Sequence, residues 1–78
     1  MEIDEDIDIS FFIPCLNEED NIGKSIECVI EVMKTTNMRY EILVVDDNSS
    51  DNTVNKVTEE MNMNKDVTIN LIKNPVTR

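Results

Sequence analysis

Residues 40–51, YEILVVDDNSSD, form the stretch that decides the fold. The run from Ile42 to Val45 places apolar side chains on both sides of an extended chain, which is typical of a strand covered on both faces. The polar stretch that follows, residues 46–53, breaks this run. We therefore expect a buried strand over Tyr40–Val45, with acidic and hydroxyl side chains gathered at its carboxyl end.

A second dense apolar run lies upstream, at Ile9–Ile13, and is followed by Pro14. Because proline cannot donate a hydrogen bond to a neighbouring strand, Pro14 predicts the end of a first strand. A helix is expected between the two strands, with Asn17 as its N-cap. Along it, apolar residues recur at the spacing of one helix face, namely Ile22, Ile26, Val29, Ile30 and Met33.

The same order of elements follows the central strand. A second helix is expected to be capped by Ser50 or Asp51. The apolar positions of this helix are Val54, Val57 and Met61. Apolar and polar residues then alternate, which predicts a less buried third strand through Val67, Ile69 and Leu71.

This alternation of strands and helices predicts an α/β fold with a parallel sheet. Right-handed crossovers place the strands in the order 3-2-1, with both helices on one face. The expected architecture is an incomplete, Rossmann-like half of a three-layer domain over residues 9–78, preceded by an acidic leader at residues 1–8. Its bare sheet face would be apolar, so we expect further chain or a partner protein to cover it.

The composition excludes several classes of function. The chain has 78 residues, of which 7 are basic and 17 acidic, and it has no histidine. The resulting net charge of −10 repels phosphate groups, so nucleic-acid and anionic-membrane binding are not expected. Cys15 and Cys28 lack the histidine partners of a zinc site and are expected to be reduced thiols. The apolar runs are too short to span a bilayer and the acidic start is unlike a signal peptide, so a cytoplasmic location is expected.

Two polar loops are expected to meet at one edge of the sheet, at residues 14–18 and 46–51. Ligands of open parallel sheets bind at that edge, beyond the carboxyl ends of the strands. The only glycine, Gly23, lies inside the first helix, so a glycine-rich phosphate loop is absent. A carboxylate in this position is suited instead to an N–H group of a nucleobase or to a ribose hydroxyl.

These loops carry a family resemblance. Residues 13–19, IPCLNEE, are similar to the opening motif of family 2 glycosyltransferases, and residues 41–53, EILVVDDNSSDNT, look like their second motif. The resemblance extends roughly over Ile9–Arg78 and is nearest to members that resemble dolichol-phosphate mannose synthase. It implies a GT-A fold whose first half binds the nucleotide of a UDP- or GDP-sugar, for transfer to an unidentified acceptor. The substrate-binding residues that it implies are Pro14, Leu16, Asn17, Glu18, Asp46, Asp47 and Ser49.

The resemblance also implies a divalent cation, Mg²⁺ or Mn²⁺, in a full-length enzyme. The D-x-D motif and the catalytic base of the family lie further along the chain, and no D-x-D follows residue 53. We therefore assign no catalytic residue and no metal ligand here, and expect a truncated chain that does not catalyse transfer alone. Membrane association is expected only through the missing chain.

Two other functions are left open. Residues 42–49, ILVVDDNS, also resemble the first strand of a phospho-receiver domain, in which the acid pair binds magnesium. A receiver needs a phospho-accepting aspartate at the end of a later strand, and the acids after Ser49 do not follow an apolar strand. The other alternative is a non-catalytic interaction module, which would dock a partner on the uncovered sheet face.

Overall fold

The computed structural model describes residues 7–74. It contains strands and helices in the alternating order that the sequence predicts. In chain order they are β1 (Ile9–Cys15), α1 (Ile22–Met33), β2 (Tyr40–Asp46), α2 (Thr53–Met63) and β3 (Thr68–Lys73). The α/β class is confirmed, and all but the last two residues of the expected acidic leader lie outside the described part of the chain.

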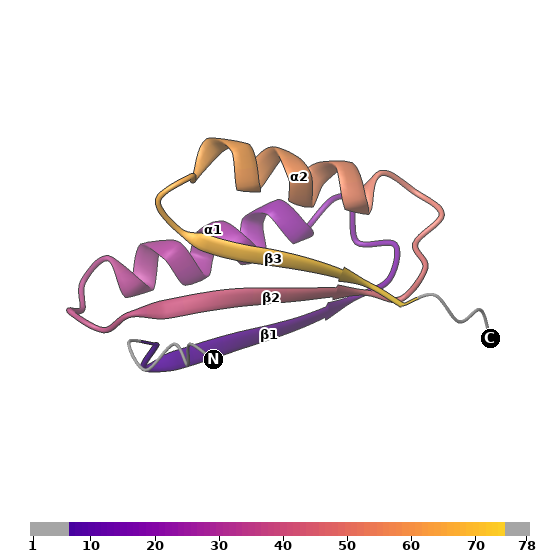
Figure 1. Cartoon of the computed structure of the whole chain (residues 1–78). Helices are drawn as coiled ribbons and strands as arrows, with labels where there is room; N and C mark the ends of the chain where they lie inside the picture. Colours follow the sequence, from indigo (N-terminus) through magenta and orange to yellow (C-terminus); the bar gives the residue numbers. More distant parts are fainter. Residues whose placement is uncertain (1–6, 75–78) are drawn as a thin grey trace.

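The three strands form one parallel sheet in the order β1-β2-β3, with β2 in the middle. Read from the opposite edge, this order is 3-2-1. Val44 lies opposite Ile13 of β1 on one side and opposite Leu71 of β3 on the other. Because the strands are parallel, all three carboxyl ends reach the same edge of the sheet, at the arrowheads in Figure 1.

Both helices cover the same face of the sheet, as the right-handed crossovers require (Figure 1). Each strand alternates between side chains that face the helices and side chains that face away. The core between the layers is aliphatic, and each fully buried isoleucine contributes about 2 kcal/mol to folding. It is formed by Cys15, Ile22, Ile26, Ile30, Ile42, Val44, Val57 and Ile69.

The buried face of α2 differs from the prediction. Of the three expected apolar positions only Val57 is fully buried, while Thr53 and Glu60 are buried as well. Glu60 points at α1 over Gly23, where an added Cβ atom would lie 3.3 Å from Glu60 Oε2. The absent side chain at Gly23 therefore provides the space that the Glu60 carboxyl group occupies.

The prediction that Pro14 ends the first strand is wrong, because β1 continues to Cys15. Ile9 donates its N–H toward the central strand, to Arg39 O at 3.2 Å, and Cys15 accepts with its carbonyl from Asp47 N at 2.9 Å. In a parallel strand alternate residues direct their backbone groups to the same side, so the nitrogen of Pro14 faces the outer edge. A proline there removes no bond between β1 and β2.

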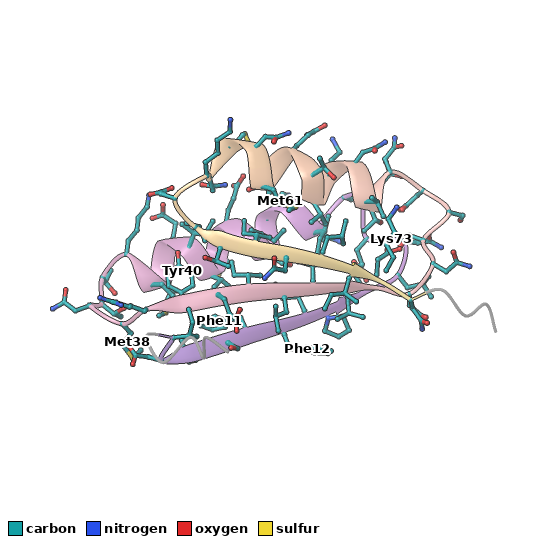
Figure 2. The ribbon with its side chains drawn as sticks, in the orientation of Figure 1. Phe11, Phe12, Met38, Tyr40, Met61 and Lys73 are labelled. Atoms are coloured by element: carbon teal, nitrogen blue, oxygen red, sulfur yellow. The ribbon has the colours of Figure 1, made fainter. Side chains whose placement is uncertain are left out.

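The other face of the sheet is uncovered in the described structure, and it is apolar toward the carboxyl end. Figure 2 shows Phe12 on the side of β1 away from the helices, where 64 % of it is exposed. Ile72 of β3 is 48 % exposed, and Leu43 and Val45 lie half-buried between them on β2. Neither helix in residues 7–74 is long and apolar enough to cross a bilayer.

Candidate functional site

The loop between β1 and α1 and the loop between β2 and α2 lie side by side at the carboxyl edge of the sheet. They occupy residues 16–21 and 47–52. The register places Cys15 opposite Asp46, so the two loops leave adjacent strands at the same level. The predicted meeting of the two polar loops is therefore confirmed.

A buried carboxylate joins the two loops. Asp46 is only 2 % exposed, and it accepts from the Ser49 hydroxyl through Oδ1 and from the Ser49 N–H through Oδ2, at 3.0 Å in the second case. The Ser49 hydroxyl oxygen in turn accepts from the Asn17 N–H at 2.9 Å. We call these three residues the Asp46 relay. Through it, the end of β2 fixes the conformation of the loop that follows β1.

Asn17 does not cap the first helix, which corrects the prediction. Helix α1 begins at Ile22, with Asn21 in the N-cap position and without a side-chain cap. Asn17 instead has a φ of 52°, in the left-handed region that asparagine tolerates better than most residues. Its Oδ1 atom accepts from the Ser50 N–H at 2.8 Å, so its side chain serves the contact between the loops.

A second group of hydrogen bonds links the loops on the side of α2. Thr53 Oγ1 accepts from the Glu18 N–H at 2.8 Å. Asp51 Oδ2 accepts from the Glu19 N–H at 3.3 Å, and Asp51 Oδ1 accepts from the Thr53 N–H at 2.9 Å. Partial desolvation raises the pKa of Asp51. The hydrogen bonds from Thr53 and from the backbone lower it by more, so the pKa of this carboxyl group lies below its usual value. The prediction that Ser50 or Asp51 caps α2 is wrong, because Asn52 takes the N-cap position without a side-chain cap. The Asp51 carboxylate instead accepts from Thr53, the first residue of α2, and from Glu19 of the neighbouring loop.

The comparisons with known proteins cover the part of the chain that contains these two loops. The family model described as "Glycosyl transferase family 2" matches residues 10–77, which include β1 from its second residue, all of β2 and β3, and both loops. The chain belongs to glycosyltransferase family 2. This membership was expected from the two loop motifs.

Two curated relatives of this glycosyltransferase chain are bacterial. An undecaprenyl-phosphate 4-deoxy-4-formamido-L-arabinose transferase of Proteus mirabilis (strain HI4320) is 35 % identical over 66 residues, which are 85 % of this chain and 20 % of the relative. An uncharacterized glycosyltransferase of Synechocystis sp. (strain ATCC 27184 / PCC 6803 / Kazusa) is 35 % identical over 69 residues, which are 87 % of this chain and 22 % of the relative. The chain therefore spans about a fifth of the length of these relatives. No solved structure gives a significant match.

The seven residues that were expected to bind substrate in this glycosyltransferase chain fall into two groups. Asn17, Asp46 and Ser49 are engaged in the relay and hold the loops together. The other four reach the surface, with Pro14, Leu16 and Glu18 exposed and Asp47 half-buried. The second group can touch a ligand without breaking a contact between the loops.

The third strand also contributes to this edge, which the sequence motifs did not indicate. Asn74 directly follows β3, and its Nδ2 atom donates to Asp47 Oδ1 at 2.9 Å. Figure 2 shows Lys73 at the same end of the strand, where it adds a cation to the acidic edge. The rule that sites lie beyond the carboxyl ends of parallel strands applies equally to β3, and it could have identified Asn74.

Cys15 lies at the same edge, with its thiol buried. The Cys15 Sγ atom lies 3.8 Å from Asp46 Oδ1. Burial, together with the negative charge of Asp46, raises the pKa of the Cys15 thiol to about 11. A thiol that stays protonated at neutral pH is a weak hydrogen-bond donor and a poor nucleophile. Cys15 and Cys28 are both free thiols.

The described residues do not fit a divalent cation. Across residues 7–74, no three side chains of the histidine, cysteine, aspartate or glutamate type converge as metal ligands. Asp46 and Asp51 already accept hydrogen bonds from the protein with both carboxylate oxygens. We therefore derive no chemical step through a metal ion for these residues.

Proposed function

We propose that this chain is the donor-nucleotide-binding segment of a glycosyltransferase that transfers a sugar from a nucleoside diphosphate to an acceptor. Membership of the family supports the reaction class. The observation that carries the binding role is the Asp46 relay. It ties the two motif loops together and leaves Leu16, Glu18 and Asp47 accessible along one edge of the sheet.

Each accessible residue has a distinct role in this proposal. Asp47 accepts a hydrogen bond from an N–H group of the base or from a ribose hydroxyl, because an ionised carboxylate only accepts. Leu16 is 51 % exposed and, beside Pro14, offers an apolar surface to the flat face of the base. Glu18 is the second acceptor, suited to the ribose. No contact to the diphosphate or to the sugar is assigned within residues 7–74.

The donor and acceptor are proposed at the level of chemical class. UDP and GDP are the donor nucleotides that the family resemblance implies, and uracil and guanine each present a ring N–H group that can donate a hydrogen bond to a carboxylate. The Proteus relative is named for undecaprenyl phosphate. A polyprenyl phosphate is therefore the acceptor class that we propose, and it agrees with the expected resemblance to dolichol-phosphate mannose synthase. A cytoplasmic location and a divalent cation in a full-length enzyme remain predictions.

The binding role is tested by titrating the uniformly ¹⁵N-labelled chain with UDP and with GDP. We expect millimolar affinity, with amide shifts at Leu16, Asp46 and Asp47 and little change at Asp66, near the opposite end of the sheet. Asp47→Ala should weaken binding about tenfold or more, since a hydrogen bond to a charged group is lost. The same titration of Asp66→Ala is the matched control. An absence of shifts in the wild-type chain at millimolar nucleotide would refute the proposal.

The uncovered sheet face supports one alternative function, a non-catalytic interaction module. Phe12 and Ile72 are both exposed there, and neither belongs to the two loops. Phe12→Ser separates the two functions, because it removes the largest apolar side chain of this face and leaves the carboxyl edge intact. A nucleotide titration that Phe12→Ser leaves unchanged supports donor binding by the loops. A loss of binding in this variant would contradict it.

A further inference from the structure

Asn74 reaches the carboxyl edge of the sheet from β3, which contributes neither of the two family motifs. The register pairs Lys73 with Asp46, and the N–H of the next residue, Asn74, donates to Asp46 O at 2.8 Å. This bond fixes the backbone of Asn74 beside the end of β2. From there, the side-chain amide donates to Asp47 Oδ1 at 2.9 Å. The backbone thus sets the place of Asn74, and the side chain acts on a different residue.

The two adjacent aspartates differ in how they are held. Both carboxylate oxygens of Asp46 accept hydrogen bonds from Ser49, and the side chain is buried. Asp47 is half-buried and is held through Oδ1 alone, so Oδ2 accepts no hydrogen bond from residues 7–74. A ligand at this edge can donate a hydrogen bond to Asp47 Oδ2 without displacing a protein group. A ligand that binds the Asp46 carboxylate would have to break the Asp46 relay.

We propose that Asn74 is a positioning residue that holds the Asp47 carboxylate with its second oxygen directed to the bound nucleotide. This inference rests on the proposed function. A neutral amide suits the task, because it orients the carboxylate and leaves its negative charge in place. An aspartate without such a partner samples several rotamers, and a ligand must then order the side chain when it binds. Loss of the Asn74 amide should weaken nucleotide binding about three- to tenfold.

A double-mutant cycle tests the coupling between the two residues. UDP and GDP affinities are measured by ¹⁵N titration for wild type, Asn74→Ala, Asp47→Ala and the double variant. We expect the double variant to bind no more weakly than Asp47→Ala, because the inferred effect of Asn74 on the nucleotide passes through the Asp47 carboxylate. Losses that simply add would overturn the inference. Asn70→Ala, which removes an exposed asparagine from the same strand, is the matched control and should bind as wild type does.

A second readout needs no nucleotide. Three-bond couplings report the χ1 angle of Asp47, which we expect to be a single rotamer in the wild type and an average in Asn74→Ala. In Asn74→Asp, which keeps the size of the side chain and replaces the donor with a second acceptor, the rotamer should also be lost. Urea midpoints show that each variant is folded.

The two kinds of failure are distinct. An unchanged Asp47 rotamer in Asn74→Ala and Asn74→Asp overturns the positioning role itself. A wild-type chain that binds neither UDP nor GDP refutes the proposed function, whatever the rotamer of Asp47.

Discussion

The two ends of the sheet are held together in different ways. At the carboxyl end, the two loops are joined by bonds between residues 32 to 35 positions apart, among them Asn17 to Ser49 and Glu18 to Thr53. At the amino end, the turn after α1 is closed by Thr35 and Thr36, which donate to carbonyls three positions earlier. Long-range bonds at that end join Arg39 to Asp8 and Ile9 at the start of β1. Local bonds are sufficient to reverse the chain. The long-range bonds at the carboxyl end fix the relative position of two loops, as a ligand site requires.

The largest expected effect comes from removing the centre of the relay. Asp46→Ala removes a buried carboxylate and leaves the half-buried Ser49 hydroxyl and N–H without their acceptor, so it should lower the free energy of unfolding by about 3 kcal/mol. Urea denaturation measures the change. Asp66→Ala, an exposed aspartate near the opposite end, should change stability by less than about 0.5 kcal/mol. Equal losses in the two variants would show that the two ends do not differ.

A second test addresses the contact between the helices. Glu60 is 5 % exposed, and burial together with Glu27 raises its pKa from 4.5 to about 7. The folded state therefore holds a proton more tightly than the unfolded state does. The contribution of Glu60 to stability is complete below about pH 4.5 and is lost as the pH rises through about 7.

Glu60→Gln should therefore stabilise the chain on the order of 2 kcal/mol at about pH 8 and change little at about pH 4. Urea midpoints across this range give the comparison, with the exposed Glu59→Gln as control. A loss of stability in Glu60→Gln at the higher pH would contradict the assigned pKa direction. The same outcome would mean that the charged carboxylate is needed between the helices.

The smallest expected effect comes from removing one hydroxyl group, and it compares the carboxyl end of the sheet directly with the amino end. Ser49→Ala removes the acceptor of the Asn17 N–H and should cost about 1.5 kcal/mol, with faster amide exchange at Asn17. Ser49→Thr keeps the hydroxyl and should retain most of the protection. Thr36→Ala, which removes a local bond at the amino end, should cost about 0.5 kcal/mol or less. Slow exchange at Asn17 in Ser49→Ala would mean that the relay does not hold the loop.

The sequence predicted the order of the elements because the apolar periodicity of each segment is strong. Ile22, Ile26 and Ile30 lie in the core as their spacing requires. The identity of the buried polar residues could not be read in this way. Glutamate is an acidic residue type, so the sequence predicts that Glu60 is exposed. Its burial depends on the space left by Gly23 of the other helix, and the apolar periodicity of a single helix does not reveal such a contact.

The site was predicted at the right edge of the sheet, but the division of roles within it was not. Asn17 was expected to cap a helix, because asparagine before an apolar stripe often does so. The helix begins later, and the Asn17 side chain instead accepts a hydrogen bond from the Ser50 N–H. Such a choice depends on which loop lies next to which. That arrangement is a property of the folded chain. Asn74 is a different case, because it directly follows a predicted strand and the rule that places sites beyond strand ends could have identified it.

The proline within β1 has a consequence for the outer edge of the sheet. A polypeptide laid along that edge would find backbone donors at Ser10 and Phe12 and none at Pro14. The carbonyl of the incoming chain that lies opposite Pro14 would stay unpaired, which disfavours non-specific pairing of extended chains with this edge. A segment that ends its pairing one step earlier, or bends away there, would avoid this loss. The edge thus discriminates among incoming strands by where their pairing stops.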